Sequence, residues 1–475
     1  MQNPCFRLII GIALLLPAAT YGAPAPGCAS APYSSLGCEF YAVSLPNPLL
    51  DQTTFAFGVD LLNAGPTQAN VSISGGGLGS PLSFAIVAGA NNVTTLPWVP
   101  ALSMSNATVK IAGAAYHIVT SAPVSAVQLN PTSAVAGMTD AFLADASLLL
   151  AATSAGKEFR ALTWPTWNSG TAQETGHVAV IGLAGAAATV TVSAAGTIQP
   201  GAGLTSSGGT VSLGQSEVLL IASAADAPPS GTGSDLSGLS ISSTVPVLVF
   251  SGHAETQVPN GVSYADHLEE VVLPTAALGQ DYFVVRPGNP TGAPTGAAHI
   301  VKIASTAVDD THVTTNPVIA GAPATLPAGA VVVFPATADF ELQTDRPVAV
   351  ATFMEGSSAF GSSGPGDPAQ SIVVPWNQAR RSIDFAAPAS IGPAWAQIVA
   401  RSGAAITLDG SAVTGWTAIG SSGYATANVV LCCSDAHHAA GNRAFTLSVY
   451  SYPDFAAYWY PAAIGFEEIF ADGFD

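Results

Sequence analysis

Apolar and polar side chains alternate along short stretches of most of the chain, as they do in a β-strand with one buried face. The segment FELQTDRPVAVATFM, residues 340–354, shows this alternation on both sides of Pro347. Short turns rich in Gly, Ala or Asn separate such stretches and favour antiparallel hairpins. The pattern therefore predicts many antiparallel strands.

A strand, a proline-valine step and a second strand recur three times along the chain. The three copies are YHIVTSAPVSAVQLN, LSISSTVPVLVFSGH and FELQTDRPVAVATFM, which contain Pro123, Pro246 and Pro347. In the second and third copies an aspartate follows the proline by 20 residues, at Asp266 and Asp367. The matched spacing indicates an internal repeat with a period of about a hundred residues.

The repeat divides the chain into four expected units, at approximately 40–168, 169–290, 291–390 and 391–463. Aromatic strands with the sequences EFRALTW, DYFVVRP and SIDFAAP are expected to close the first three units. We predict an all-β fold of repeated antiparallel units that are β-sandwich-like and closely packed. A closed, β-propeller-like ring is the alternative. Short connections between the units argue against independent domains joined by flexible linkers.

The composition supports this fold class and limits the partners. Charged residues form 9% of the chain, whereas 48 Gly and 35 Pro residues favour tight turns. Helix-forming Lys, Glu, Gln and Arg are too scarce to cover the exposed faces of long helices. The formal net charge of −19 would repel a polyphosphate backbone, so no nucleic-acid partner is expected.

The N-terminus has the form of a secretory signal peptide. Arg7 precedes a short apolar stretch, residues 8–16, and small residues follow, which predicts a signal peptide at residues 1–22. The stretch is shorter than the roughly 20 residues that span a bilayer as a helix, so no transmembrane span is expected. The mature chain is therefore expected to be secreted or to lie on the outer cell surface. Residues 464–475 are acidic and aromatic and are expected to form a projecting tail.

Four cysteines remain after removal of the signal peptide, namely Cys28, Cys38, Cys432 and Cys433. An even number suits disulfide formation in an oxidising compartment. The simplest pairing joins Cys28 to Cys38 and leaves Cys432 and Cys433 as a vicinal bridge or as two free thiols. Three connectivities are possible, and the sequence does not choose among them.

The densest group of polar side chains comprises His253, Asp266, His267, Glu269 and Glu270. Imidazole and carboxylate groups could bind a ligand or a divalent metal. Neighbouring residues of a strand point to opposite faces, so at most two or three of these side chains could converge with His253. We favour a structural role, in which His253 forms a hydrogen bond with Asp266 across a turn. If the group binds a ligand instead, the candidate binding residues are His253, Asp266, His267 and Glu269. No metal or other cofactor is expected.

A catalytic function has little support in the sequence. We find no nucleophile elbow in a strand–turn–helix context, no phosphate-binding loop, no HExxH helix and no dinucleotide fingerprint. The motif CCSDAHH, residues 432–438, places two cysteines side by side, which rarely suits a zinc site. We expect a non-enzymatic protein. The alternative is a secreted, possibly metal-dependent hydrolase centred on His253, Asp266 and His267.

Several segments resemble the N-terminal domain family of the immunoglobulin G Fc-binding protein. They are DLSGLSISSTVPVLVFSGH, which ends at His253, DHLEEVVLPTAALGQDYFVVRP from Asp266, GCEFYAV near the start and VYSYPDFAAYWYP near the end. The segment GCEFYAV is similar to the opening of bacterial members. The resemblance extends from about Cys38 to Ala463. Cysteines of the animal pattern near the histidine and the DHL segment are absent, because Ala254 and Ala265 stand nearby instead.

The resemblance implies a binding protein of the cell exterior. Combined with the repeat, it favours an adhesion or binding function in which loops after each proline-valine strand contact the ligand from a rigid β-scaffold. The expected ligand is a protein or a glycan. Binding of immunoglobulin Fc is implied by the family name alone. Recurrent tryptophans near strand ends could add a contact surface if they are exposed.

Overall fold

The computed structural model describes Cys28 and residues 34–132, 143–289, 297–361, 365–388, 392–431 and 436–465. The expected signal peptide, Cys432, Cys433 and nearly all of the expected tail lie outside the described residues. The described chain is almost entirely antiparallel β-structure, which confirms the all-β prediction. Its helical elements are a short α-helix, α1 (Pro100–Ser103), and the 3-10 turns η1 (Ala152–Ser154), η2 (Thr275–Ala277), η3 (Ser357–Phe360) and η4 (Trp376–Gln378).

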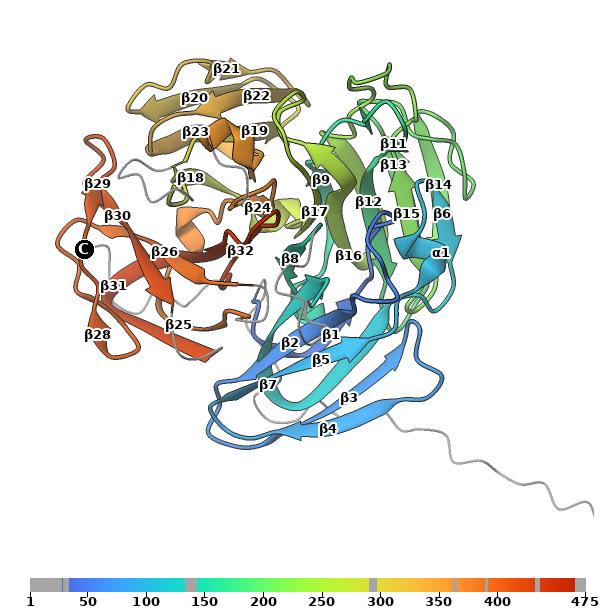
Figure 1. The fold of residues 1–475 in the computed structure, drawn as a ribbon, viewed down its shortest axis with the longest axis horizontal. Coiled ribbons are helices and arrows are strands. Elements are labelled where there is room, and N and C mark those ends of the chain that lie inside the picture. The colour runs from blue at the N-terminus through green and yellow to red at the C-terminus, as the bar shows by residue number, and fades with distance from the viewer. Residues whose placement is uncertain are drawn as a thin grey trace, which may run out of the picture.

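Strand pairing groups most of the described strands into four large sheets (Figure 1). The first sheet contains β1 (Gly37–Ala42), β2 (Phe57–Asn63), β3 (Ala69–Gly75), β4 (Leu82–Ile86), β5 (Ala90–Leu96), β7 (Tyr116–Asn130) and β8 (Asp145–Leu148). The second contains β6 (Val109–Ile111), β9 (Gly156–Ala161), β12 (Gly176–Gly182), β13 (Ala188–Ser193), β14 (Gly208–Leu213), β15 (Val218–Ala222), β16 (Leu239–Gln257) and β17 (Ala265–Val271). A separate hairpin joins β10 (Trp167–Asn168) to β11 (Gln173–Glu174).

The other two sheets repeat this plan. The third contains β18 (Gly279–Val284), β19 (His299–Ser305), β20 (Thr311–Asn316), β21 (Thr325–Leu326), β22 (Val331–Ala336), β23 (Phe340–Met354) and β24 (Gln370–Ile372). The fourth contains β25 (Arg380–Ala386), β26 (Ala394–Arg401), β27 (Ile406–Leu408), β28 (Ser411–Ala412), β29 (Thr417–Ala418), β30 (Tyr424–Leu431), β31 (Ala436–Ser451) and β32 (Tyr458–Pro461).

Each sheet is built on one long strand that changes partners near its middle. In the third sheet, β18 and β20 pair mainly with the part of β23 before Pro347, whereas β19 and β24 pair with the part after it. The strands β7 and β16 change partners in the same way around Pro123 and Pro246. Proline lacks a backbone N–H and interrupts a ladder, so the change of partners falls where the sequence weakens the pairing. The sheets therefore curl into sandwich-like units.

The strands that follow the long strands meet at the centre of the molecule. Here β8 packs against β17 and β32, and β24 packs against the same two strands, so the four form a closed circuit. Figure 1 shows the four curled sheets around this centre. The beginning and the end of the described chain also meet, because the Ser35 backbone N–H donates to the Ile464 carbonyl at 3.0 Å. The structure thus combines both expected arrangements, because sandwich-like units are closed in a ring.

The aromatic strands lie at a different place in the repeat from the one expected. The strands β9, β18 and β25 pair with β16, β23 and β31, which are the long strands that follow them in the sequence. They therefore open the next sheet and do not close the preceding one. We propose unit boundaries that follow this pairing, at 37–148, 156–271, 279–372 and 380–461.

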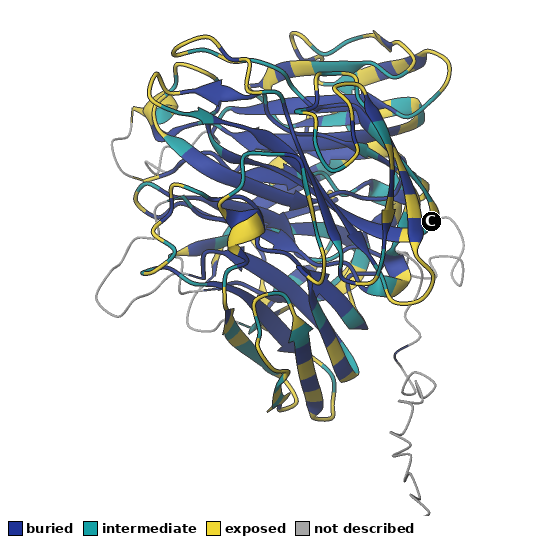
Figure 2. Ribbon diagram, turned by 90° about the vertical axis from the view of Figure 1, so that its right-hand side faces the viewer, coloured by how far each residue is buried: buried dark blue, intermediate teal, exposed yellow. Residues whose placement is uncertain are grey.

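Buried side chains fill both the single units and the boundaries between them. One large apolar cluster joins the first, second and fourth sheets and includes Phe40, Phe250 and Phe445, all at most 1% exposed. Figure 2 shows buried residues along the inner strands and exposed residues on the outer turns. No helix among the described residues is long and apolar enough to cross a membrane.

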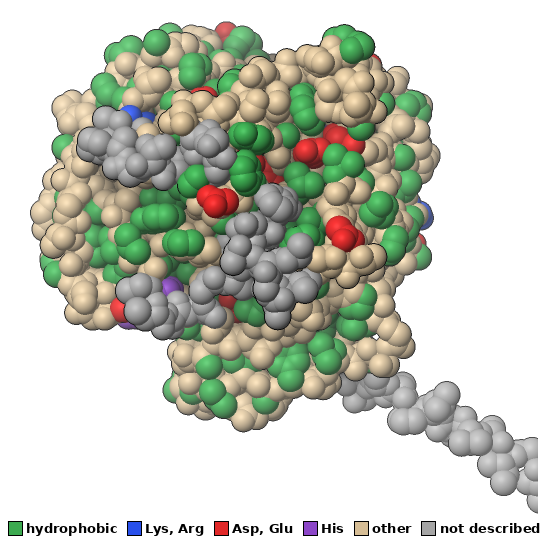
Figure 3. Space-filling view, in the orientation of Figure 1, with side chains coloured by type: hydrophobic (Ala, Val, Ile, Leu, Met, Phe, Trp, Pro, Cys, Tyr) green, Lys and Arg blue, Asp and Glu red, His purple; other side chains and the backbone are tan. Residues whose placement is uncertain are grey.

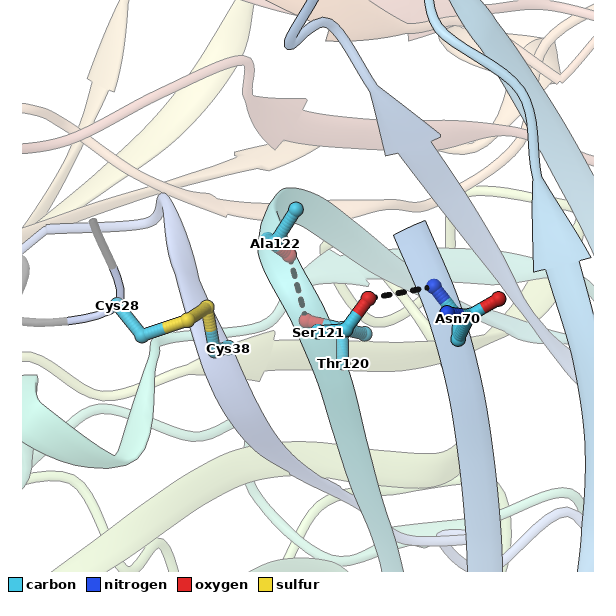
Figure 4. The surroundings of a disulfide bond; sticks show 6 residues. All are labelled: Cys28, Cys38, Asn70, Thr120, Ser121 and Ala122. Carbon is cyan, nitrogen blue, oxygen red and sulfur yellow. Dashed lines mark hydrogen bonds between the residues drawn. A yellow bond between two sulfur atoms is a disulfide. The ribbon is translucent and has the colours of Figure 1, made fainter. Parts of the chain in front are cut away.

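A disulfide joins Cys28 to Cys38 on β1, with 5.4 Å between the two Cα atoms (Figure 4). The expected pairing of Cys28 with Cys38 is confirmed, whereas the state of Cys432 and Cys433 stays a prediction. Near it, the hydroxyl group of Ser121 accepts a hydrogen bond from the backbone N–H of Asn70 at 2.8 Å, where β3 pairs with β7.

Candidate functional site

A buried carboxylate occupies the centre of the ring. One oxygen of Asp145 on β8 accepts the backbone N–H groups of Glu269 on β17 and Gln370 on β24, each at 3.0 Å. Its other oxygen accepts the N–H of Trp459 on β32 at 3.4 Å. A single side chain of the first sheet is thereby bonded to the central strands of the other three.

The polar residues of β17 bond to their neighbours on both sides of the strand. On one side, Asn130 and Gln128 of β7 donate to the carboxylate of Glu269 at 3.0 and 3.2 Å. On the other side, the Ser147 hydroxyl donates to Glu270 at 2.8 Å, and Asp266 accepts the backbone N–H of Ala457 at 3.2 Å. Because β17 lies between other strands, both of its faces are buried, and each polar side chain needs a partner there.

The candidate binding residues all lie in the interior. His253, Asp266, His267 and Glu269 are each 0% exposed. His267 and Glu269 contact Asn130 on one side of β17, and Asp266 contacts Ala457 on the other. His253 lies opposite Leu268 in the neighbouring strand, and its side chain contacts the segment before β10. The expected pairing of His253 with Asp266 is replaced by other partners for each side chain. None of the four therefore presents a surface to a ligand outside the ring.

The hydrogen bonds of His253 define its protonation. Its Nε2 atom lies 2.9 Å from the Pro165 carbonyl, to which it must donate, and its Nδ1 atom accepts the Glu255 backbone N–H at 3.2 Å. Burial lowers the pKa of His253 to about 3, with the nearby His267 adding to the effect. The imidazole of His253 is therefore neutral in the folded protein, and its hydrogen bonds hold it in place in the structure.

Carboxyl groups continue outward from the centre toward the surface. Burial raises the pKa of Asp266 and Asp367 well above the usual range, and the two groups lie close enough to repel each other. Farther out, burial and the neighbouring Glu174 raise the pKa of Glu255 to about 7. These groups favour their protonated forms, because little positive charge is close enough to offset the loss of water.

Metal-binding geometry is absent from the described part of the chain, where no group of three or more His, Cys, Asp or Glu side chains could hold an ion. The motif at 432–438 lies partly outside the described residues. Its two histidines bond to carboxylates, His437 to Asp409 and His438 to Asp384, each at 2.7 Å.

Three of the loops that follow the long strands meet on one face of the ring. The backbone N–H of Gly356 donates to Val258 at 2.9 Å, and that of Ser358 donates to Ser263 at 2.7 Å. Pro365 forms a β-bridge with Asp454 of the next loop. We call residues 258–264, 355–361 and 452–457 the loop face. Figure 3 shows one side of the molecule, with several acidic side chains near its middle.

An aromatic pair lies on the loop face. Tyr264 is 41% exposed, and its ring meets the edge of Phe455 with 5.1 Å between the ring centroids. Phe455 has a φ of +55°, a conformation that a bulky residue adopts only when its surroundings hold it. Sequence reasoning missed this pair because it weighed tryptophans, which in the described residues are buried or half-buried.

Two cavities between the sheets are small. One of about 40 Å³ lies between the third and fourth sheets beside Trp459, and one of about 20 Å³ lies between the second and third sheets beside Gln370. Sites for small organic ligands usually measure roughly 300–1,000 Å³. These two cavities have room for water molecules, so the loop face offers the better contact surface for a larger ligand.

Comparison with known proteins identifies one family. The sequence model described as IgGFc binding protein matches residues 145–451, which is more than half of the chain. The match begins at β8 and ends with β31, so it includes three of the four central strands, β8, β17 and β24, and the long strands of the second, third and fourth sheets. No curated protein and no solved structure matches the chain.

Proposed function

Because the chain belongs to the IgGFc binding protein family, we propose that it is an extracellular binding or adhesion protein that holds a protein ligand at the loop face. The observation that carries this proposal is the linkage of loops from three sheets by backbone hydrogen bonds. Loops fixed to one another lose little conformational entropy when a partner binds, which favours recognition by a preformed surface.

The buried residues of β17 have a supporting function in this proposal. Asp266 accepts a hydrogen bond from the backbone N–H of Ala457, the last residue of the fourth-sheet part of the loop face. Glu269 and His267 fix β17 against β7 through Asn130. We therefore assign His253, Asp266, His267 and Glu269 to positioning of the loops, and we propose no catalytic step.

We also propose that the protein is a secreted or surface-attached bacterial member of the family. The support is the signal-like segment at residues 1–22 and the opening GCEFYAV. An oxidising exterior would maintain the disulfide between Cys28 and Cys38.

The test is a binding screen with the mature chain, residues 23–475, immobilised in one orientation. Immunoglobulin Fc fragment, a panel of extracellular proteins and a glycan array are presented to the wild type, to Tyr264→Ala and to the control Asp310→Asn. Asp310 is an exposed carboxylate outside the loop face. Binding of a protein that Tyr264→Ala weakens and Asp310→Asn does not would support the proposal. Binding of glycans alone, or of a protein equally by all three forms, would contradict it.

A further inference from the structure

We infer that the loop face binds a cationic side chain, a lysine or arginine on a basic segment of a partner protein, against the ring of Tyr264. This inference rests on the proposed binding function and specifies the chemistry of the partner. It follows from the exposed aromatic pair, from the charges around it and from the positions of the protein's own cations.

The aromatic pair is suited to a cation. In the described part of the chain, Tyr264 is the aromatic residue whose side chain is most clearly exposed. Phe455 packs against it at an interplanar angle of 74°, and Tyr264 keeps 41% of its surface exposed in this contact. An ammonium or guanidinium group over such a ring is attracted by the negative charge of the π-face.

Two acidic residues lie next in sequence to the residues that contact Tyr264. Glu355 precedes Gly356, whose backbone is so close to Tyr264 that an added Cβ would lie 2.7 Å from the Tyr264 carbonyl oxygen. Asp454 precedes Phe455 and is exposed. Burial raises the pKa of Glu355, so a cation placed beside it would favour the ionised carboxylate. The aromatic ring and the two carboxylates together offer a site for one positive charge.

The protein supplies no positive charge of its own to these loops. Their sequences, 258–264, 355–361 and 452–457, contain neither lysine nor arginine. Two cations elsewhere in the third sheet and beside it already have partners, because Lys302 pairs with Asp235 and Arg286 pairs with Asp339. A basic partner would therefore be attracted to the middle of the face, whereas an acidic glycan or a lipid phosphate would be repelled.

The first measurement uses a synthetic twelve-residue peptide rich in Lys, Arg, Gly and Ser, and a second peptide in which Gln replaces each basic residue. Fluorescence anisotropy reports binding to the mature chain at low salt and at high salt. We expect the basic peptide to bind, with an affinity that falls as salt rises, and the Gln peptide to bind at least tenfold more weakly. Equal binding of both peptides would overturn the inference.

Matched variants test whether the site is the loop face. Tyr264→Phe keeps the π-face and should bind like the wild type, whereas Tyr264→Leu keeps an apolar side chain and should bind about threefold more weakly. Glu355→Gln and Asp454→Asn should each weaken binding by a similar factor. Asp310→Asn removes one charge elsewhere and should have little effect. A loss in Asp310→Asn as large as in Asp454→Asn, or equal affinities for Tyr264→Phe and Tyr264→Leu, would overturn the inference.

The outcomes distinguish this inference from the proposed function. The binding screen could find a protein partner whose affinity falls in Tyr264→Ala but not in Tyr264→Leu or at high salt. That result would confirm the loop face as a binding surface and overturn the cationic contact. A neutral glycan that stacks on Tyr264 without salt dependence would also overturn it. Unchanged circular dichroism and melting temperature of the Tyr264 variants would show that a lost contact, and not misfolding, explains the result.

Discussion

Asp145 shows how one residue can hold a repeated structure together. Its carboxylate accepts backbone N–H groups from β17, β24 and β32, and those groups have no water to replace it because Asp145 is fully buried. Burial raises the pKa of this carboxyl well above its ordinary value, although the backbone hydrogen bonds oppose the change. The residue therefore contributes to stability mainly as an acceptor at the point where the sheets meet.

We predict that Asp145→Ala strongly destabilises the fold. The substitution removes the acceptor of four buried backbone N–H groups, those of Ala146, Glu269, Gln370 and Trp459, and each such group costs about 1–3 kcal/mol. The expected loss in the free energy of unfolding is therefore at least about 3 kcal/mol, measured by urea denaturation. Asp310→Ala, at an exposed site, is the control and should change little. A loss below about 1 kcal/mol for Asp145→Ala would mean that the donors find other acceptors.

Glu255 gives a prediction about pH. Its pKa is about 7 in the folded chain and roughly 4.3 in an unfolded chain. Between these values the unfolded chain releases the proton and the folded chain keeps it, so this group lowers stability as the pH rises from about 4.5 to 7. Glu255→Gln should therefore stabilise the protein at pH 8 by on the order of 2 kcal/mol and have little effect at pH 4.5.

The measurement is the difference in unfolding free energy between Glu255→Gln and the wild type across this pH range. Burial lowers the pKa values of His253 and His299, so protonation below about pH 6.5 favours the unfolded chain and stability rises with pH there. Taking the difference between variant and wild type removes this contribution. A difference that is constant with pH would show that Glu255 titrates normally. Asp310→Asn should give such a constant difference.

Residue identities were easier to anticipate than their exposure. The density of polar groups singled out His253, Asp266, His267 and Glu269 as candidate binding residues and predicted a pairing of His253 with Asp266 that the structure does not contain. It could not show that the strands carrying them are covered on both faces, because burial depends on sheets that lie far away in the sequence. Asp145 was missed, because the first repeat lacks the 20-residue spacing between proline and aspartate that marks Asp266 and Asp367.

At the scale of elements, the alternating pattern and the proline-valine step predicted the long strands. The pattern could not assign the aromatic strands, because a strand between two repeats can pair with either. The structure shows that β9, β18 and β25 pair with the following long strand. Phe159 of β9 lies opposite Ile241 of β16 and is 2% exposed, so the apolar face of β9 is buried on the core of the second sheet.

The disulfide anchors the start of the first sheet and gives a prediction about redox conditions. It closes a short loop onto β1, with a sequence separation of 10, and its loss should lower the unfolding free energy by roughly 2–3 kcal/mol. The measurement is urea denaturation of the wild type with and without reductant. The variant Cys28→Ser should match the reduced wild type and should not respond to reductant. A further loss in that variant on reduction would place a second redox-sensitive bond elsewhere in the chain.

At the scale of the whole molecule, the closed ring could not be chosen from the sequence alone. Alternation shows which face of a strand is buried but not which neighbouring unit covers it, so separate sandwiches and a ring fit the same pattern. Contacts between the first and last sheets decide the matter. They include the backbone bond from Ser35 to Ile464 and the packing of β25 against β2 and β7.

A ring with shared contacts should unfold as one unit. The large apolar cluster joins the first, second and fourth sheets, and Lys302 of the third sheet is buried against the second, where it donates to Thr163 and Asp235 at 2.7 Å each. Independent sandwiches would instead melt separately.

We predict a single calorimetric transition for the mature chain, with calorimetric and van't Hoff enthalpies that agree. Lys302→Ala, which leaves Asp235 unpaired, should move that whole transition to lower temperature, whereas Lys157→Ala at an exposed position should not. A second, smaller transition in Lys302→Ala would show that the third sheet unfolds on its own. Two transitions in the wild type would show that ring closure adds little cooperativity.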